Sequence, residues 1–483
     1  MLSAISSPLH GVSRRELLRL AAFTPVTIAS AHETPIEAGF GKAKRCILLF
    51  LWGSPSQLET WDPKPDAPPE IRGEFGSVPT SISGIRIGGL FPRIAKLANK
   101  VTFVRSLTHN HPIHGTAFAL TARPTTDLDA EGDTARDPRH WPYIGSVVDH
   151  YEEQRDARPP AIPRNFGLPF PLGSHRRLKP GPYGGFLGGA YDTVWSDFRA
   201  KGTREVLRDA GAPDVPTKMV ADPFLGILPT DRFDAAADDP TIVLDRLNRR
   251  ASLLEQLDST ERRRSKQPGE EAFNKQHLLA RTVLASGRLR NALDIQREPA
   301  RLRERYGMTL FGQSCLAARR LLEAGGKFVT VCWDEYGLVN TGWDTHVHMK
   351  SRMTEELGPG FDAAFATLIE DLEARGMLED TAIAVVSEHG RTPRIQNVDG
   401  GGRDHWARAY SSLFAGGGFA RGRVVGRTDR LGGEVVEAPF SPKDVIATLF
   451  HLLGINPESE IHDRFARPWR IGGPGIVRTE LIG

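Results

Sequence analysis

The chain has 483 residues, with 62 Lys and Arg against 59 Asp and Glu and a formal net charge of +3. This near balance excludes a dedicated nucleic-acid binder, which would carry a clear basic excess. Hydrophobic residues at 40% and charged residues at 25% are ordinary globular values, so wholesale disorder is excluded as well. The three cysteines, Cys46, Cys315 and Cys332, are too few for a disulfide scaffold and lie in apolar segments, so we expect them to be buried and reduced.

The N-terminus has the pattern of a twin-arginine export signal over residues 1–31. Arg14 and Arg15 precede a modest apolar run, and a small-residue site follows at 29–31. A basic amphipathic helix on the domain surface is the alternative interpretation. The apolar run is too short for a membrane span, and no later segment offers about 18 uninterrupted apolar residues. We therefore expect a periplasmic or extracellular protein without a stable membrane span after signal removal.

The first predicted unit is a strand, a helix and a second strand. Residues 44–52 (KRCILLFLW) form an apolar run between basic residues and a Gly-Ser-Pro turn, which is typical of a buried parallel strand. A helix is predicted at 91–99 and a short strand at 101–104, and the histidine-rich segment 108–116 follows. This order indicates a β-α-β unit.

The middle of the chain changes character twice. Residues 126–240 are rich in Pro and Gly and poor in long amphipathic periods, so we expect loops and short elements there. Residues 241–306 are rich in Arg, Glu, Gln and Leu, which predicts two or three amphipathic helices. We therefore expect a single domain over residues 42–483 that carries a helical insertion.

Helices and strands alternate through the last third of the chain. Apolar stripes predict the helices, short apolar runs predict the strands, and Ser441 before Pro442 predicts the start of the final helix. The predicted elements are helix 311–322, strand 328–333, helix 357–372, strand 381–387, strand 410–415 and helix 442–453. This alternation indicates an α/β fold, a doubly wound, mostly parallel sheet with helices on both faces.

Histidine-rich loops adjoin four of the predicted strands. Ligands of such sheets bind at the carboxyl ends of the strands, so these four loops can bring their side chains to one rim. Three of the loops also carry carboxylates. The candidate metal ligands on them are Asp344, His346, His348, Glu388, His389 and His405, and His114 lies on the fourth loop.

Imidazole and carboxylate groups together predict a divalent metal. Zinc is favoured, with manganese, calcium or iron as alternatives, and one or two ions are possible. Two nearby ions would clamp a phosphoryl or sulfuryl group during in-line displacement. Asp344 with His346 and Asp344 with His348 are alternative ligand pairs, and the sequence does not choose between them.

A hydrolase also needs a nucleophile and a positive group for the anion. Thr116 and Ser106 are the hydroxyl candidates, and Thr116 stands where the histidine-rich loop turns into a helix. A helix N-cap is the alternative role of Thr116. Arg391 is the candidate for anion stabilisation, with a structural ion pair as its alternative. His111 and His114 are candidate ligands, proton donors or loop hydrogen-bonders.

Motifs spread over nearly the whole chain after the signal carry a resemblance to a known family. They are GSPSQLETWDPKPDAPPEIRGEF, REPARLRERYG, FGQSCLAARRLLEAGGKFVTV, GWDTH, SEHGRTPRI, GRDHW and SPKDVIATLFHLLGI. In this order they resemble the DUF1501 family, bacterial exported proteins with an alkaline-phosphatase/sulfatase-like fold. No single motif is specific, but their combined order is.

The resemblance implies a sheet whose rim holds up to two metals. In that superfamily one metal is held by an Asp-x-x-x-His pair and a distant His, which map to Asp344, His348 and His405. The second is held by a pair after a strand, here Glu388 and His389, together with the nucleophile and an acidic residue after the first strand.

The chain departs from the superfamily at the end of its first strand. Gly53 and Ser54 stand where an Asp is expected, and Glu59 and Asp62 are the nearest acidic residues. The Cys/Ser-x-Pro-x-Arg signature of sulfatases is absent from the sequence as well.

These features fit two functions. The first is an exported metal-dependent hydrolase of phosphate or sulfate esters, acting on a small-molecule or polysaccharide ester such as a sulfated polysaccharide, with Thr116 or water as the attacking group. The second is a non-catalytic exported binding or scaffold protein that keeps the phosphatase-like fold. The retained cluster of His, Asp and Glu favours the first, and the missing Asp near Ser54 favours the second.

Overall fold

The computed structural model describes residues 38–111, 114–123, 132–198, 200–208, 218–235, 282, 286–336 and 341–483. The described residues form one compact unit. The predicted export signal lies outside them, as does most of the predicted helical segment 241–306, of which α8 (Gly287–Leu293) and α9 (Ala300–Tyr306) are described as helices. None of the described helices combines the length and apolarity needed to cross a membrane.

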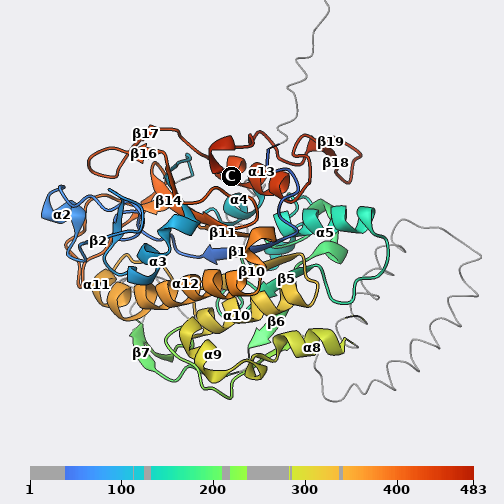
Figure 1. The fold of residues 1–483 in the computed structure, drawn as a ribbon, viewed down its shortest axis with the longest axis horizontal. Helices are drawn as coiled ribbons and strands as arrows, with labels where there is room; N and C mark the ends of the chain where they lie inside the picture. Colours follow the sequence, from blue (N-terminus) through green and yellow to red (C-terminus); the bar gives the residue numbers. More distant parts are fainter. Residues whose placement is uncertain are drawn as a thin grey trace, which may run out of the picture. The chain divides into compact units, whose positions relative to one another are not determined.

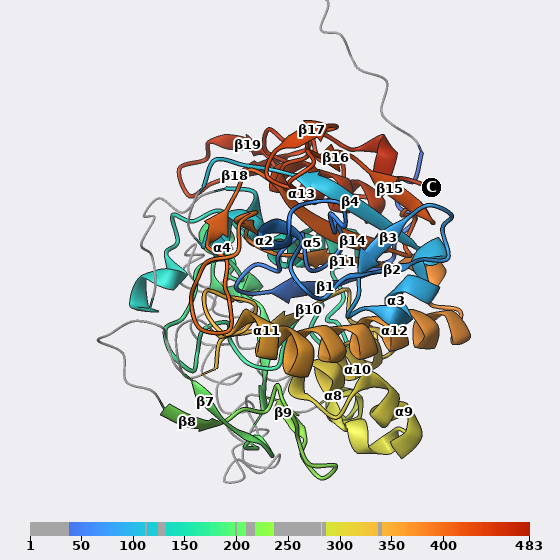
Figure 2. The ribbon, with the colours of Figure 1, turned by 90° about the vertical axis from the view of Figure 1, so that its left-hand side faces the viewer.

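A nine-stranded sheet forms the centre of the described part of the structure (Figures 1 and 2). Its strands, in spatial order, are β15 (Arg423–Val425), β4 (Val101–Leu107), β14 (Tyr410–Ala415), β11 (Thr381–Val386), β1 (Arg45–Leu51), β10 (Phe328–Trp333), β5 (Asn165–Leu168), β6 (Val194–Phe198) and β9 (Phe233–Ala235). The five strands from β11 to β6 pair in parallel. Only β14 and β9 run against their neighbours. The prediction of a mostly parallel sheet is confirmed.

Both faces of this sheet are covered by helices. In β1, Ile47 and Leu49 pack with one group of buried side chains while Leu48 and Phe50 pack with the other, as the two-residue period of a strand requires. One face carries α3 (Pro92–Lys96), α10 (Leu310–Glu323) and α12 (Gly358–Ala374), and the opposite face carries α4 (Thr116–Thr121), α5 (Ile144–Arg155) and α13 (Pro442–Leu452) (Figure 1). The doubly wound architecture is confirmed.

The stretch predicted as loops, 126–240, holds more regular structure than its sequence indicates. It contains α5 and three strands of the main sheet, β5, β6 and β9. In β5 only four residues pair, which is too short for a periodic pattern. In α5 the buried residues lie in the first half, and the second half resembles polar loop sequence. Pairing with β10, which is buried along its whole length, holds β5 in the sheet.

Small elements surround the sheet. The two-stranded ones are β2 (Ser77–Pro79) with β3 (Arg86–Gly88), β7 (Glu205–Arg208) with β8 (Lys218–Ala221), β12 (Gly390–Arg391) with β13 (His405–Trp406), β16 (Arg427–Thr428) with β17 (Val435–Glu437) and β18 (Glu460–His462) with β19 (Pro468–Arg470). Short helices are α2 (Pro69–Arg72) and α11 (Met349–Arg352). The pair β12–β13 lies beyond the carboxyl end of β11 and contributes directly to the site.

The start of α13 offers a stability test. Ser441 accepts a hydrogen bond from the Asp444 N–H while the Asp444 carboxylate accepts one from the Ser441 N–H, a complete capping box, as the Ser-Pro pair predicted. We expect Ser441→Ala to lower the free energy of unfolding by about 1 kcal/mol, because the first turn loses a partner for its N–H groups. Urea unfolding measures this. The control is Ser83→Ala at an exposed turn, and an equal loss in both variants would contradict the prediction.

Candidate metal centre

Four histidine rings meet at the rim formed by the carboxyl ends of β1, β4, β10 and β11. His405 is at their centre, with its ring centroid 4.3 Å from that of His114, 4.6 Å from His389 and 4.8 Å from His346. Each comes from a different loop. The structure therefore brings together histidines from all four of the loops that the sequence singled out.

The pair β12–β13 determines where two of these segments meet. Arg391 lies opposite His405 in its antiparallel register. Because β14 runs antiparallel to β11, the segment that precedes β14 returns to the edge at which β11 ends. His389 and His405 therefore approach one another although they are 16 positions apart in the sequence.

Asp344, His346 and His405 form a triangle of ligand atoms. His346 Nε2 lies 3.1 Å from Asp344 Oδ1 and 3.0 Å from His405 Nε2, and His405 Nε2 lies 3.6 Å from Asp344 Oδ1. In a tetrahedral zinc site with bonds of 2.0–2.1 Å, two ligand atoms are about 3.3 Å apart. These edges are close to that spacing, so the three ligand atoms are placed to hold a zinc-sized ion.

Second partners orient two of the imidazoles. His346 Nδ1 lies 2.9 Å from the Asp404 carboxylate, the carboxylate–histidine arrangement that orients metal ligands. His389 Nδ1 is 2.8 Å from the Gly390 carbonyl oxygen, which can only accept, so Nδ1 must donate and Nε2 keeps its lone pair. That Nε2 is buried and has no hydrogen-bond partner. A buried lone pair without a partner is costly unless it binds something, and this fits a metal ligand.

His114 lies between the two carboxylates of the site. Its ring stacks on Trp52, Nε2 is 3.5 Å from Asp344 Oδ2, and Nδ1 is 3.3 Å from Glu388 Oε1. Burial alone would lower the pKa of His114, but its hydrogen bonds to the two carboxylates raise this pKa to about 9. His114, His389 and His405 also form a second group of three possible ligands.

The charges of the site keep Asp344 ionised. Burial opposes ionisation, but the Arg391 guanidinium and the hydrogen-bonded imidazoles hold the Asp344 pKa well below its usual range. Burial and the neighbouring cations hold the pKa of His389 well below its usual range, and they also lower that of His405. Both imidazoles are thus neutral at pH 7, the form in which they bind metals.

His348 lies outside this cluster. It has a left-handed backbone conformation at the start of α11, with φ of 52°, and its Nδ1 is 3.5 Å from the carboxylate of the exposed Asp399. The structure therefore brings His346 to Asp344, in place of the His348 that the family resemblance implied. The turn before α11 directs the two histidines to different partners.

Arg391 is fully buried and fully paired. Its Nε donates to the Ser54 carbonyl at 3.0 Å, and Nη1 faces the Arg403 carbonyl at 3.1 Å and His346 Nε2 at 3.4 Å. Its Nη2 donates to the Gly53 carbonyl and to Asp344. The five N–H groups of the guanidinium are thereby taken up. This differs from the predicted anion-binding role and matches the structural ion pair, in which Arg391 holds Asp344 in place.

Glu388 contacts the end of β1, where the family resemblance led us to expect an Asp. Its Oε1 accepts from the Gly53 N–H at 3.2 Å, and its Oε2 accepts from Ser54 Oγ at 3.3 Å and from Ser387 Oγ at 2.7 Å. His109 Nε2 donates to the Glu388 carbonyl at 2.6 Å and fixes its backbone. A carboxylate from the neighbouring strand thus reaches the tip of β1.

The two acidic residues nearest to Ser54 turn away from the site. Glu59 accepts from the buried Arg403 Nε at 2.9 Å, and Asp62 contacts Lys64 at 3.0 Å and Thr428. Neither belongs to the groups of possible metal ligands among the described residues. Glu59 instead anchors the loop that carries His405, so these two residues are structural.

Comparison with known proteins assigns the chain to a protein family. The profile of one family, described as "Protein of unknown function (DUF1501)", matches residues 43–482. The chain belongs to the DUF1501 family. No curated protein matches this DUF1501 chain.

Solved structures similar to this DUF1501 chain share little sequence with it. Ps i-CgsB in complex with k-i-k-neocarrahexaose is 11% identical over 86% of this chain and 72% of that chain, with a TM-score of 0.40. The PsFucS1 sulfatase from Pseudoalteromonas sp. is 13% identical over 86% and 68%, with a TM-score of 0.36. A protein in the alkaline phosphatase superfamily from Vibrio parahaemolyticus is 10% identical over 87% and 68%, with a TM-score of 0.37.

Thr116 occupies the predicted position in this DUF1501 chain, at the first residue of α4, and it is buried. Within the described residues, its hydroxyl makes no hydrogen bond to the cluster.

Three residues of the site were not predicted from the sequence. Asp404 orients His346, Trp52 stacks on His114, and His109 fixes the backbone of Glu388. Asp404 directly precedes His405 in the sequence, and that adjacency was the one available signal.

Gly53 is required by the close approach of β1 to Asp344. Its φ is +98°, and an added Cβ would lie 2.2 Å from the Asp344 backbone nitrogen. We expect Gly53→Ala to displace Asp344, weaken metal binding and destabilise the fold by more than the left-handed strain alone, about 1 to 2 kcal/mol. Urea unfolding and metal titration measure both effects. The matched control is Gly84→Ala, which has φ of +76° and open space around it; equal losses in the two variants would contradict the prediction.

Proposed function

We propose that this DUF1501 protein is an exported metal-dependent hydrolase of phosphate or sulfate esters. The observation that carries the proposal is the triangle of Asp344, His346 and His405, whose ligand atoms lie 3.0 to 3.6 Å apart, close to the spacing of ligand atoms around a zinc ion. The unpartnered Nε2 of His389 supports it. A buried cluster of this composition is costly in a purely structural core.

The ligand set favours zinc. Imidazole nitrogen with carboxylate oxygen suits zinc, manganese or iron, whereas calcium prefers oxygen ligands alone. Asp344, His346 and His405 would hold one ion, and His114, His389 and His405 are the alternative group. Because a neutral imidazole has one lone pair, His405 serves one of the two groups at a time, and His114 is free to carry a proton when the ion is held by the first. When bound, the metal acts as a Lewis acid that stabilises charge on the phosphoryl or sulfuryl oxygens.

The chain's own residues supply positioning and protons. Arg391 holds Asp344, and Asp404 orients His346. His114 carries a proton between two carboxylates and is the group placed to protonate a leaving ester oxygen. Thr116, at the start of α4 and two residues after His114, remains the hydroxyl candidate for attack, with water as the alternative.

The proposed export rests on a sequence feature that lies outside the cluster. The twin-arginine pattern at 1–31 supports work outside the cytoplasm, where a small-molecule or polysaccharide ester is the proposed substrate. A non-catalytic binding or scaffold role is the second candidate. It is favoured by one observation, that Gly53 and Ser54 replace the expected Asp and bind Glu388 instead.

Turnover of simple esters tests the proposal. The purified mature chain is assayed on an aryl phosphate and an aryl sulfate, beside His405→Ala and the control His462→Ala, whose histidine is exposed on β18. We expect wild-type turnover on at least one ester, loss of it in His405→Ala and its retention in His462→Ala. Turnover that is independent of His405 contradicts the enzyme proposal, and metal binding without turnover supports the scaffold role.

A further inference from the structure

A second site lies apart from the metal cluster. A groove with a volume of ≈ 340 Å³ separates the segment after α4 from the β18–β19 hairpin. Its walls include Trp141, Phe186, Phe465 and Trp469, and arginines line its rim. None of its lining residues belongs to the metal cluster. The volume lies in the range of small-molecule sites, and the combination of aromatic walls with guanidinium groups specifies the kind of ligand.

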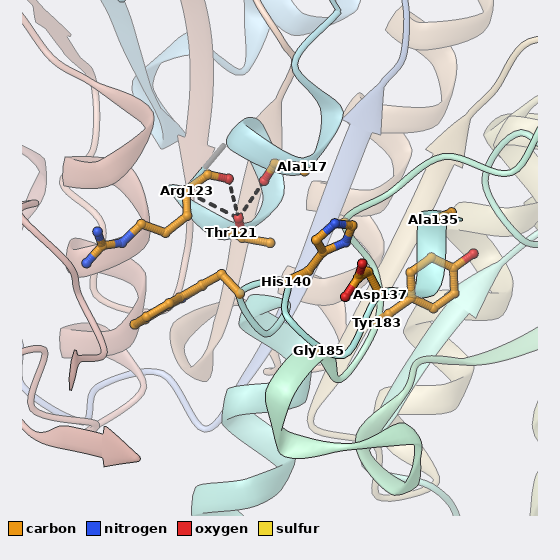
Figure 3. Close-up of a pocket in the computed structure, with 10 residues that line it drawn as sticks. Ala117, Thr121, Arg123, Ala135, Asp137, His140, Tyr183 and Gly185 are labelled. Carbon is orange, nitrogen blue, oxygen red and sulfur yellow. Dashed lines mark hydrogen bonds between the residues drawn. The ribbon is translucent and has the colours of Figure 1, made fainter. Parts of the chain in front are cut away.

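Arg123 is held in a corner made by two indole rings. Its Cζ is 4.7 Å from the centre of Trp141 and 5.5 Å from that of Trp469, and the two rings are 6.0 Å apart at 89°. In the described part of the chain no carboxylate forms an ion pair with Arg123, and its Nε is buried without a hydrogen-bond partner. Figure 3 shows the guanidinium pointing away from His140 and Asp137. Arg123 is therefore a pre-positioned donor without an anion.

The hairpin adds a second donor without an acidic partner. Arg464 Cζ lies 5.2 Å from the ring centre of Phe465, a side chain that is 65% exposed, and no ion pair of Arg464 occurs among the described residues. The one carboxylate of the described groove lining, Asp463, is already neutralised. It accepts from Arg467 Nε at 2.7 Å and from Trp469 Nε1 at 3.1 Å. The groove thus has an uncompensated positive charge beside exposed aromatic surface.

This combination fits a sugar ring that carries an anionic group. Aromatic faces pack on the apolar C–H face of a saccharide, and a guanidinium donates a pair of hydrogen bonds to a sulfate or carboxylate. We propose that the groove binds an anionic saccharide unit of a glycan. That this glycan is the substrate rests on the proposed function. Binding of the glycan to the groove does not require turnover.

The helix α4 connects the groove to the cluster. His114 precedes α4 and Arg123 follows it, and Ala117 and Thr121 of α4 line a small pocket next to the groove (Figure 3). A helix of six residues is about 9 Å long. One oligosaccharide can therefore contact Arg123 while presenting an ester to the rim that holds His114.

Calorimetric titration of the whole mature chain tests the groove. The probes are a chondroitin sulfate hexasaccharide, the unsulfated chondroitin hexasaccharide and neutral maltohexaose, which separate sulfate, carboxylate and neutral sugar. The variants are Arg123→Ala, Arg464→Ala and Trp469→Ala, and the control is Arg421→Ala, a half-exposed arginine outside the groove. Thermal unfolding of every variant shows whether it folds. If Trp469→Ala does not fold, the two arginine variants are sufficient to test the groove.

We expect at least one anionic hexasaccharide to bind and maltohexaose not to bind. Arg123→Ala and Arg464→Ala should each weaken the anionic ligand about tenfold or more, while Arg421→Ala leaves Kd within about twofold of the wild type. Absence of binding to both anionic probes, equal binding of maltohexaose, or equal loss in the control would overturn the inference. Aryl-ester turnover in the same samples separates the two proposals: binding without turnover leaves the groove standing, and turnover without binding leaves only the hydrolase.

Discussion

Asp344→Asn is expected to lower kcat/KM on an aryl ester by at least about 10²- to 10³-fold, the range seen when one electrostatic stabiliser of a reaction is removed. The substitution keeps the shape of the side chain and removes its charge. Asp344 contacts Arg391, His346 and His405 and touches His114, so its carboxylate is the shared anion of the cluster. Loss of that anion weakens metal binding and leaves the guanidinium without its partner.

The matched control for this substitution is Asp399→Asn. Asp399 is an exposed carboxylate that contacts His348, outside the cluster. We expect its kcat/KM to match the wild type. Steady-state kinetics with circular dichroism on both variants decide the prediction, and a folded Asp344→Asn protein with wild-type kcat/KM would refute it.

Arg391→Leu is expected to destabilise the fold by about 3–5 kcal/mol, because it leaves the buried Asp344 without its cation. The carbonyl oxygens of Gly53, Ser54 and Arg403 lose their donor as well. An arginine that only held a substrate anion would lose activity on substitution while the fold kept its stability. The prediction therefore separates the structural role of Arg391 from the catalytic role that sequence alone favoured equally.

Urea unfolding measures this destabilisation, with Arg421→Leu as the control. Arg421 is 47% exposed and pairs with Glu379 at the surface, so its loss should change the free energy of unfolding by no more than about 0.5 kcal/mol. If Arg391→Leu unfolds at the same urea concentration as the wild type, the structural assignment of Arg391 is wrong.

The sheet was predictable because its central strands are buried on both faces. β1, β10 and β11 are six or seven residues long and apolar except for Arg45, Thr330 and Thr381, and such runs are typical of the central strands of an α/β sheet. The strands β5 and β6 escaped prediction because they are four and five residues long and owe their place to pairing with their neighbours. No local pattern encodes that pairing.

The sequence predicted which loops meet at the site, but it did not predict which side chains of those loops contact one another. A histidine that follows a parallel strand must emerge at the carboxyl edge, so the convergence of four loops follows from topology. Which of His346 and His348 turns inward depends on the left-handed residue at 348, and a sequence pattern does not show this. The pairing of Arg391 comes from a two-residue ladder, β12–β13, which is too short to predict.

The central claim is that the cluster around His405 binds a divalent metal, and elemental analysis of the purified mature chain tests it most directly. His405 is the informative position because it belongs to both groups of possible ligands. We predict at least one equivalent of zinc or another divalent transition metal per wild-type chain and its loss from a folded His405→Ala chain. A wild-type chain that binds no transition metal after incubation with zinc, or a His405→Ala chain that binds as much as the wild type, would contradict the account.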